Sequence, residues 1–317
     1  MAPMSSYISD TEQIHNSSAW TFAGLAVDES GSCYAAERKG LRNIKPKGLI
    51  VRYPNPFAGG GQPELLYKSS DPFQHLWRAP GGRLHVLGNK KYHFEVEVKG
   101  KSKFKTKAMT KPAQRMVRIR GFGDRLILAF GWPDAYVELV EGEPRPLEIG
   151  LGGHCEDIAG TGPDDIYVSS TEGIVHFDGE RWQSVPDAPE AACLLCMSRD
   201  EVYATGRDPE QGKVFAVYRG NAREGFRGIL RTDALDDVDD LNRIFAALGA
   251  IYLVQTHGQQ RGLYRLRDGG VEKVMSATSL TGRVAGNDDL LWIENGIELL
   301  CFDGSQWLQV PRVDALT

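Results

Sequence analysis

The sequence predicts an all-β fold, a seven-bladed β-propeller built from four-stranded antiparallel blades. The first observation is an internal repeat: segment 173–186, GIVHFDGERWQSVP, returns as segment 296–311, GIELLCFDGSQWLQVP, with two residues inserted. The second is the spacing of apolar second-strand centres, which recur 36 to 51 residues apart along the chain. Four-stranded units that repeat at roughly 40–50 residues are typical of propeller blades. One such sheet cannot bury both of its faces, so the repeats are expected to close into a ring.

Each clear copy of the repeat reads as two hairpins. Residues 174–177 form a short apolar run, Asp178-Gly179 follows it, and Trp182 begins the return strand. The Asp-Gly pair tolerates the positive φ angles of a type I′ turn, and Pro186 ends the strand because proline cannot donate to a central ladder. Residues 155–168 supply the other hairpin, so one unit contains four antiparallel strands.

The whole chain, 1–317, is expected to form one propeller domain. The expected blades span about 19–68, 72–109, 114–150, 153–186, 190–230, 241–275 and 279–311. Uneven loops are expected at 38–47, 88–103, 207–213 and 233–240, and the only helical turn near 236–241. The ring closes either by packing of blade seven on blade one, or by a clasp in which Ser6–Ser9 adds an edge strand.

The motif GTGPDDIYV at 160–168, followed by GIVHFDGERW at 173–182, resembles a widespread class of bacterial β-propeller repeats. In that class each blade carries a unit of the form sDvyavG…G.i.hydG..W. The signatures of WD40 and kelch repeats are absent from this chain. The class is functionally mixed, so the resemblance implies a propeller fold and leaves the function open.

Composition and charge indicate which kinds of partner and which cellular compartment to expect. The chain has 317 residues, 41% hydrophobic content, a net charge of −5 and a pI near 5.9. Nucleic-acid-binding domains are usually basic, so nucleic acid is not an expected partner. No apolar run is long enough to span a membrane and the first residues do not resemble a signal peptide, so a cytoplasmic location is expected. The five cysteines are an odd number, and four of them fall in or beside predicted strands of different blades, which indicates free buried thiols: Cys33, Cys155, Cys193 and Cys301.

Sequence motifs of catalysis and cofactor binding are missing. The chain has no G-x-S-x-G elbow, no H-E-x-x-H and no P-loop. Cys193 and Cys196 match C-x-x-C only formally, because residues three apart on a strand face opposite sides. Trp182 and Trp307 recur in register, which favours packing between blades over sugar binding. No catalytic residue, metal ligand or cofactor is therefore predicted.

A lysine-rich hairpin is the first candidate binding surface. Lysines alternate with other residues at Lys101, Lys103, Lys105 and Lys107. A period of two places these ammonium groups on one face of a strand. The face could dock an acidic protein or a phosphate backbone. The alternative is an outer edge strand whose lysines prevent aggregation.

An acidic segment is the second candidate. It contains Asp236, Asp237, Asp239 and Asp240. Carboxylates at short spacing suit calcium, although the glycine and the terminal glutamate of an EF-hand loop are absent. A solvated insertion and a surface for a basic partner are the alternatives.

The third candidate is the central channel of the predicted ring. His75, Glu156, Arg243 and Arg283 are expected on first strands, which line the channel, together with Arg118, Asp157 and Asn242. Such a polar funnel could take a small ligand or a peptide. It also matches the solvated channel of any propeller.

These observations favour a non-catalytic protein-binding propeller. Its partner would be a protein held on one loop face, and the chain alone is expected to be monomeric. One such role is that of a bacterial immunity-type protein that neutralises a toxin or effector by stoichiometric binding. The alternative is a hydrolase or lyase with a polar site at the central channel, with or without assistance by a metal ion.

Overall fold

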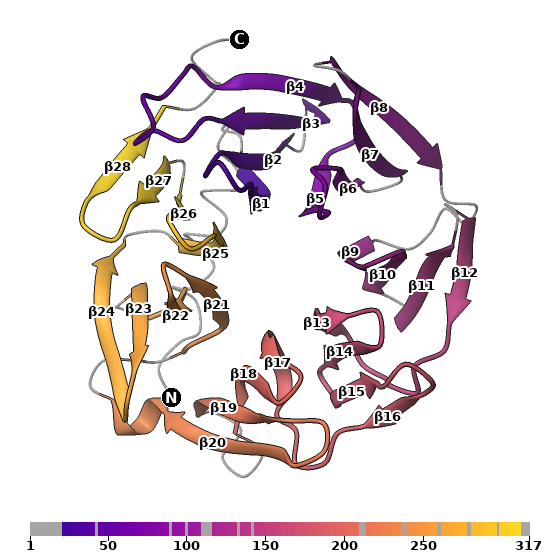
Figure 1. The fold of residues 1–317 in the computed structure, drawn as a ribbon, viewed down its shortest axis with the longest axis vertical. Coiled ribbons are helices and arrows are strands. Elements are labelled where there is room, and N and C mark those ends of the chain that lie inside the picture. The colour runs from indigo at the N-terminus through magenta and orange to yellow at the C-terminus, as the bar shows by residue number, and fades with distance from the viewer. Residues whose placement is uncertain are drawn as a thin grey trace.

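The strands form a ring of consecutive antiparallel sheets around an open centre (Figure 1). The computed structural model describes residues 21–41, 44–88, 91–98, 101–108, 116–131, 134–140, 143–208, 214–235, 238, 240–258, 261–277, 280–296 and 298–311. Within these ranges the strands make seven four-stranded sheets, and neighbours in each sheet are consecutive in the chain. The all-β class and the four-stranded antiparallel unit are confirmed. We number the sheets as blades one to seven in chain order.

The first strand of each blade faces the centre of the ring. These innermost strands are β1 (Thr21–Val27), β5 (Phe73–Arg78), β9 (Met116–Phe122), β13 (Cys155–Gly162), β17 (Glu190–Ser198), β21 (Arg243–Ala247) and β25 (Leu280–Gly286). Because every blade follows the same strand order, all of them run in one direction along the channel.

The remaining strands complete the blades outward. Blades one to three add β2 (Cys33–Leu41), β3 (Ile44–Tyr53), β4 (Glu64–Ser69), β6 (Leu84–Gly88), β7 (Lys91–Val98), β8 (Lys101–Ala108), β10 (Arg125–Gly131), β11 (Asp134–Val140) and β12 (Glu143–Leu147). Blades four and five add β14 (Asp165–Ser170), β15 (Gly173–Phe177), β16 (Trp182–Ser184), β18 (Glu201–Arg207), β19 (Phe215–Asn221) and β20 (Gly225–Arg231). Blades six and seven add β22 (Ala250–Gln255), β23 (Gly262–Arg267), β24 (Gly270–Ser276), β26 (Leu291–Asn295), β27 (Glu298–Phe302) and β28 (Trp307–Val310).

The polar residues of the repeat motif hold blade four together. The buried carboxylate of Asp165 accepts a hydrogen bond from Thr161 Oγ1, and its Oδ1 lies 2.8 Å from His176 Nε2. The Tyr167 ring packs on His176, with centroids 4.4 Å apart. The aspartate, tyrosine and histidine of the motif are therefore structural, since a buried carboxylate is costly without partners.

The Asp-Gly turns differ from the predicted type I′ turn. Only the glycines are left-handed: φ is +100° at Gly179 and +93° at Gly304, whereas neither aspartate has a positive φ. The Asp303 carboxylate accepts the N–H groups of Ser305 and Gln306 instead. These hydrogen bonds lower the pKa of Asp303 to about 2. The side chain, not an unusual aspartate backbone, closes the turn.

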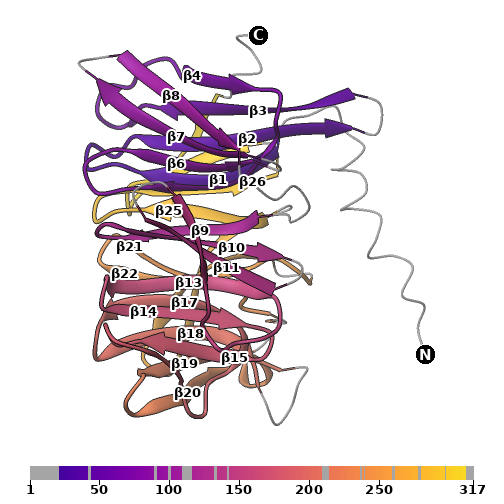
Figure 2. The same cartoon turned by 90° about the vertical axis from the view of Figure 1, so that its right-hand side faces the viewer.

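Three irregular segments were also placed wrongly by the sequence. Of the expected loop at 88–103, residues 91–98 and 101–103 lie in the paired strands β7 and β8. Residues 38–47 were expected as a loop, but β2 and β3 continue as a hairpin through the pairs Lys39↔Lys47 and Leu41↔Ile44. Figure 2 shows this hairpin extending past the neighbouring strands. The apolar alternation used for the prediction does not reach this far, so the pairing went unseen. Among the described residues, the helical turn is a 3-10 turn at Thr232–Ala234, before the expected 236–241.

Packing of blade seven on blade one closes the ring. All four strands of blade seven come from the C-terminal part of the chain. Trp292 is fully buried among residues of both blades, and its Nε1 donates to Gly31 O at 3.1 Å. A Cβ on Gly31, whose φ is +79°, would lie 2.5 Å from Leu290 Cδ1. The packing alternative is confirmed, whereas the clasp segment 6–9 lies outside the described residues.

The core is a series of apolar clusters between neighbouring blades. Trp182 belongs to the cluster between blades three and four, and Trp307 to the cluster between blades six and seven, which confirms their packing role. All five cysteines are free. Cys193 and Cys196 pack into different clusters on the two sides of β17, as their spacing predicts. In the described part of the chain, no helix has the length and hydropathy needed to cross a bilayer.

Candidate functional site

The channel end at which the innermost strands begin is the first candidate site, and we call it the channel mouth. Register shifts interrupt the pairing near the start of five of these strands, between Phe22/Gly24, Phe73/His75, Cys155/Asp157, Glu190/Cys193 and Leu280/Val284. In β9 a shift lies at the corresponding place, opposite Ala129/Phe130. A β-bulge re-aims a side chain and is common beside functional sites. Here the bulges free Glu156 and Arg283 from the regular alternation.

A hydrogen-bond chain links three blades at the channel mouth. Asp157 Oδ2 on β13 accepts Leu194 N at 3.0 Å and the Cys193 thiol at 3.4 Å. Arg243 Nη1 on β21 lies 3.0 Å from the Cys193 sulfur. Burial raises the pKa of the Cys193 thiol, so the thiol stays protonated and can donate to Asp157. The Cys193 sulfur and the carboxylates of Asp157 and Glu156 in turn raise the pKa of Arg243.

The same chain of contacts extends to the blades on either side. Arg118 Nε on β9 donates to the backbone oxygen of Glu156 at 2.9 Å. On the other side, a Cβ placed on Gly282 would lie 3.5 Å from Arg243 Nε, so the backbone next to Arg283 is in contact with Arg243. Burial lowers the pKa of Arg283 to about 10; the charges of Arg243, Arg38 and Arg118 act in the same direction, and the carboxylate of Glu294 opposes them. At neutral pH the guanidinium group of Arg283 is therefore still charged.

His75 lies among these arginines. Its Nδ1 is buried and has no hydrogen-bond partner in the structure. Burial lowers its pKa well below 6.5, and the charges of Arg118, Arg120, Arg283 and Arg243 act in the same direction. The imidazole is therefore neutral at pH 7 and can offer a lone pair or an N–H, but no charge.

The structure brings the predicted channel residues together. His75, Glu156, Arg243 and Arg283 lie at one mouth, although their use in binding stays a prediction. The sequence did not identify Cys193 as the link between Asp157 and Arg243. The only signal in the sequence was that Cys193 lies in the first strand of a blade. Its side chain was interpreted as part of the packed core, without a role at the channel.

The acidic segment does not assemble a site within the described residues. Asp236, Asp237 and Asp239 lie outside them. Asp240 is buried, and its Oδ2 accepts Asn242 Nδ2 at 3.0 Å and contacts His257 Nδ1 at 2.8 Å. Its carboxylate thus fixes the segment that leads into β21. Among the described residues no group of three or more histidine, cysteine or acidic side chains is placed to hold a metal ion.

The lysine-rich hairpin forms the outer part of blade two. The residues Lys101, Lys103, Lys105 and Lys107 lie on β8, which pairs only with β7 in its sheet. An outer edge strand rich in lysine matches protection against edge-to-edge pairing. The docking alternative stays a prediction.

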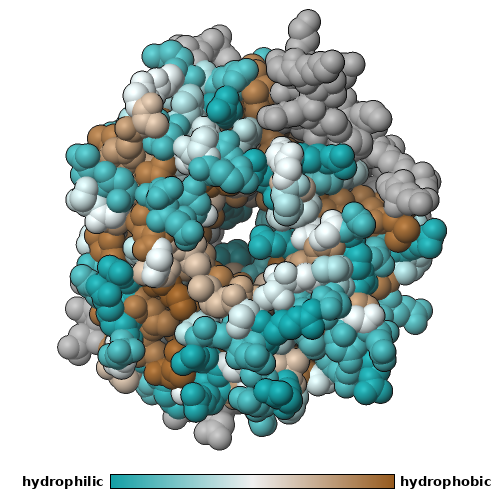
Figure 3. All heavy atoms as spheres, viewed as in Figure 1, coloured by the Kyte–Doolittle hydropathy of each residue, from teal (hydrophilic) through white to brown (hydrophobic). Residues whose placement is uncertain are grey.

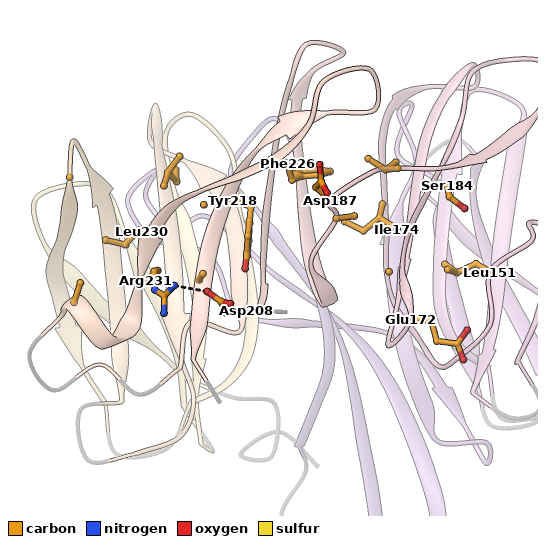
Figure 4. A pocket seen from close by; sticks show the side chains of 18 residues that line it. Leu151, Glu172, Ile174, Ser184, Asp187, Asp208, Tyr218, Phe226, Leu230 and Arg231 are labelled. Carbon is orange, nitrogen blue, oxygen red and sulfur yellow. Dashed lines mark ion pairs between the residues drawn. The ribbon is translucent and has the colours of Figure 1, made fainter. Parts of the chain in front are cut away.

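A second candidate site lies on the outer rim, in a cleft between blades four and five (Figure 4). Its volume is about 940 Å³. Apolar side chains from both blades line it, among them Ile174, Phe226 and Leu230. Figure 4 shows the ion pair of Arg231 Nη1 with Asp208 Oδ2, at 2.9 Å, on the blade-five side.

A neighbouring cleft of about 700 Å³ lies between blades five and six. It shares Ile229 and Leu230 with the first cleft. Met197 and Ile229 line it and are 48% and 38% exposed, two of the three large hydrophobic side chains that are exposed in the described residues. Figure 3 shows apolar surface beside the central opening over blade six. A third, smaller cleft is lined by Phe226 and Arg227, so residues of β20 line all three.

We compared the chain with known proteins. No family model matches it, and no curated protein sequence matches it. Its fold is similar to virginiamycin B lyase from Staphylococcus aureus, with a TM-score of 0.65, 12% identity, and coverage of 92% of this chain and 95% of that one. A chain of the mitotic checkpoint complex has a TM-score of 0.64 and 12% identity, with coverage of 98% and 97%. YCF48 bound to the D1 peptide has a TM-score of 0.51 and 15% identity, with coverage of 72% and 77%. At these identities the similarity shows the β-propeller fold.

Proposed function

We propose that this propeller is a non-catalytic protein-binding protein that holds an extended segment of a partner protein along β20, the outer edge of blade five. One observation carries the proposal: three clefts are lined by residues of this strand. Two of the three exposed large hydrophobic side chains, Met197 and Ile229, line one of these clefts.

β20 has the backbone needed for this binding mode. In its sheet it pairs only with β19, so its outer edge can accept another strand. Its register shifts between Leu230 and Gly228, which makes Ile229 a bulged residue exposed at the rim. Gly228 leaves room for a second backbone to approach, because a Cβ there would meet no atom closer than Tyr218 Cε1 at 3.9 Å.

Some of the other outer strands carry features that oppose pairing, whereas β16 and β28 do not. β8 has a lysine at every second position, and β12 contains Pro144 and Pro146. β20 contains neither lysine nor proline. Edge lysines and prolines are common protection against unwanted strand addition, so their absence from a strand that lines three clefts favours β20 as a binding edge.

The structural neighbours support protein binding in a general way. They include YCF48 bound to a peptide, nidogen in complex with laminin, and a chain of the mitotic checkpoint complex. Neutralisation of a toxin or effector is a finer hypothesis. Nothing in the geometry favours it over other stoichiometric binding, so the proposal stops at a protein partner.

The test is affinity capture from lysate with three forms of the tagged protein: wild type, Ile229→Asp and Gln309→Asp. Gln309 is exposed on β28, the outer strand of blade seven, and is the matched control. We expect one near-stoichiometric protein with wild type and Gln309→Asp, reduced at least tenfold with Ile229→Asp. Equal capture by all three forms would place the partner elsewhere, and capture of nothing would remove the proposal.

A second candidate is a hydrolase or lyase at the channel mouth. The observation that favours it is the gathering of His75, Glu156 and three arginines at the mouth, on a fold that virginiamycin B lyase shares. Such an enzyme would lose turnover of its substrate on His75→Ala, with the fold retained. A screen of ester and lactone substrates that shows no His75-dependent turnover, with and without added divalent metal, would exclude this candidate.

A further inference from the structure

The cleft between blades four and five combines apolar walls with an excess of negative charge. Among the described residues that line it, four are charged: Glu172, Asp187, Asp208 and Arg231. Arg231 already has two carboxylate partners, since its Nη1 lies 2.9 Å from Asp208 Oδ2 and its Nη2 lies 3.0 Å from Asp233 Oδ2. Neither Glu172 nor Asp187 forms an ion pair within the described part of the chain, so no neighbouring cation compensates these two carboxylates.

The carboxylates of Asp187 and Glu172 lie toward opposite ends of β20. Asp187 is next to the start of the strand, because a Cβ placed on Gly225 would lie 3.9 Å from Asp187 Cβ. Arg231 is the last residue of the strand. Figure 4 shows Asp187 beside Phe226, whereas Glu172, like Arg231, lies toward the other end of the cleft. A segment bound along β20 would therefore meet one carboxylate near each of its ends.

Between these ends the blade-four side of β20 is apolar and open. Gly228 pairs with Tyr218, which packs in the cluster between blades four and five, so position 228 faces the cleft and places no side chain in it. Ile174 of blade four lines the cleft as well. The middle of the cleft can therefore take an apolar side chain from a bound segment.

The other arginine of β20 faces away from this cleft. Arg227 pairs with Arg219, whose guanidinium lies over the Tyr203 ring, 5.8 Å from the ring centroid. Tyr203 packs in the cluster between blades five and six. Directly opposite residues of an antiparallel pair share a face, so Arg227 lies on the blade-six side and does not compensate the carboxylates.

We propose that the segment bound along β20 is basic, with lysine or arginine at two positions four residues apart that flank an apolar residue. The inference rests on the proposed function. Side chains of an added strand alternate between its two faces, so residues i, i+2 and i+4 face the cleft together, and i and i+4 are about 13 Å apart. The order reads the same in both directions, so it holds for a parallel or an antiparallel strand.

Long basic side chains suit this cleft better than short polar ones. The aliphatic stem of a lysine or arginine can lie along apolar walls while its charged end stays in water beside a carboxylate. Tyr218 and Phe226 add aromatic rings to the lining, which attract a cation. Each ion pair at such an exposed place changes the Kd by up to about fivefold, so two pairs are needed for a clear preference.

The test is fluorescence anisotropy with two labelled synthetic peptides at about 50 mM sodium chloride, where screening is weak. Both are seven-residue polythreonine peptides with blocked ends and a central valine. One carries lysine at its second and sixth positions, and the other carries glutamate there. We expect the lysine peptide to bind at least tenfold more tightly.

The outcomes separate this inference from the proposed function. Equal binding of the two peptides would overturn the basic segment and leave protein binding on β20 in place. No binding of the lysine peptide would also overturn it, whereas partner binding itself is decided by the capture experiment with Ile229→Asp.

Variants locate the effect on the two carboxylates. Asp187→Asn removes one charge and suits the left-handed backbone at this position, where φ is +51°. Glu172→Gln removes the other. Each should weaken binding of the lysine peptide about two- to fivefold, and the double variant about tenfold. Asp289→Asn, at an exposed aspartate of blade seven, is the matched control and should leave binding unchanged. Equal binding by the double variant and by Asp289→Asn would overturn the proposal.

Discussion

Two junctions between neighbouring blades are built from the same kind of strands, yet one is filled and the other is open. Between blades seven and one, Trp292, Tyr53 and Leu299 fill the wedge with fully buried side chains. On both sides of blade five the outer wedge remains a cleft, of about 940 and 700 Å³. A ring needs every blade to pack against its neighbours near the channel, whereas the outer part of a wedge can be left open. An open wedge is therefore where a propeller can gain a binding surface without loss of closure.

The largest expected effect is at the filled junction. Trp292→Ala removes a fully buried indole and its hydrogen bond to Gly31, and should lower the free energy of unfolding by about 3–5 kcal/mol. Urea denaturation followed by circular dichroism measures it. Trp307→Ala, at a half-buried indole, is the control and should cost less. If the two variants lost the same free energy of unfolding, the junction between blades seven and one would contribute no more to stability than the packing around Trp307, contrary to this account.

A titratable group lies in another filled junction, between blades two and three. His85 is buried beside Trp77 and Tyr92, and burial lowers its pKa to about 4 from an ordinary value of 6.5. Between these values the unfolded chain binds a proton that the folded protein does not, so stability falls as the pH falls. The difference corresponds to about 3 kcal/mol at full effect.

The measurement compares the free energy of unfolding at pH 7.5 and pH 4.5. Other groups also titrate in this range, so the informative quantity is the difference between variants. His85→Asn should lose roughly 2–3 kcal/mol less than wild type over this interval. Gln309→Asn, at an exposed and non-titrating residue of β28, is the control and should behave as wild type. If His85→Asn kept the pH dependence of the wild type, protonation of His85 would not be the cause of the loss of stability at low pH.

The smallest effect on stability is expected at the open junction. Ile229→Asp changes an exposed side chain on an edge strand and should alter the free energy of unfolding by no more than about 0.5 kcal/mol. The same urea titration measures it. A loss above 2 kcal/mol would show that Ile229 belongs to the core, and capture experiments with this variant would then report unfolding.

The sequence predicted the fold where local signals and long-range packing agree. The repeated Asp-Gly and tryptophan positions placed the strands of blades four and seven, because turn chemistry and apolar alternation coincide there. The 38–47 hairpin was missed, because backbone pairing continues there without apolar alternation. The turn type was missed, because a carboxylate hydrogen bond replaced an unusual backbone conformation.

The candidate sites show a similar division. His75, Glu156, Arg243 and Arg283 could be expected at the channel because first strands line it. The link through Cys193 depends on a bulge in β17 and on a neighbouring blade, which no local pattern encodes. The clefts beside β20 went unpredicted for the same reason. They arise from how far apart two blades lie at the rim, and single-strand patterns carry no signal for that distance.

Hydrogen exchange of the β20 backbone amides, with and without the captured partner, tests the central claim most directly. The account predicts strong slowing of exchange at residues 225–231 on binding, with little change on β28 at 307–310. Slowing confined to the channel strands, or to the lysine-rich β8, would contradict binding along blade five.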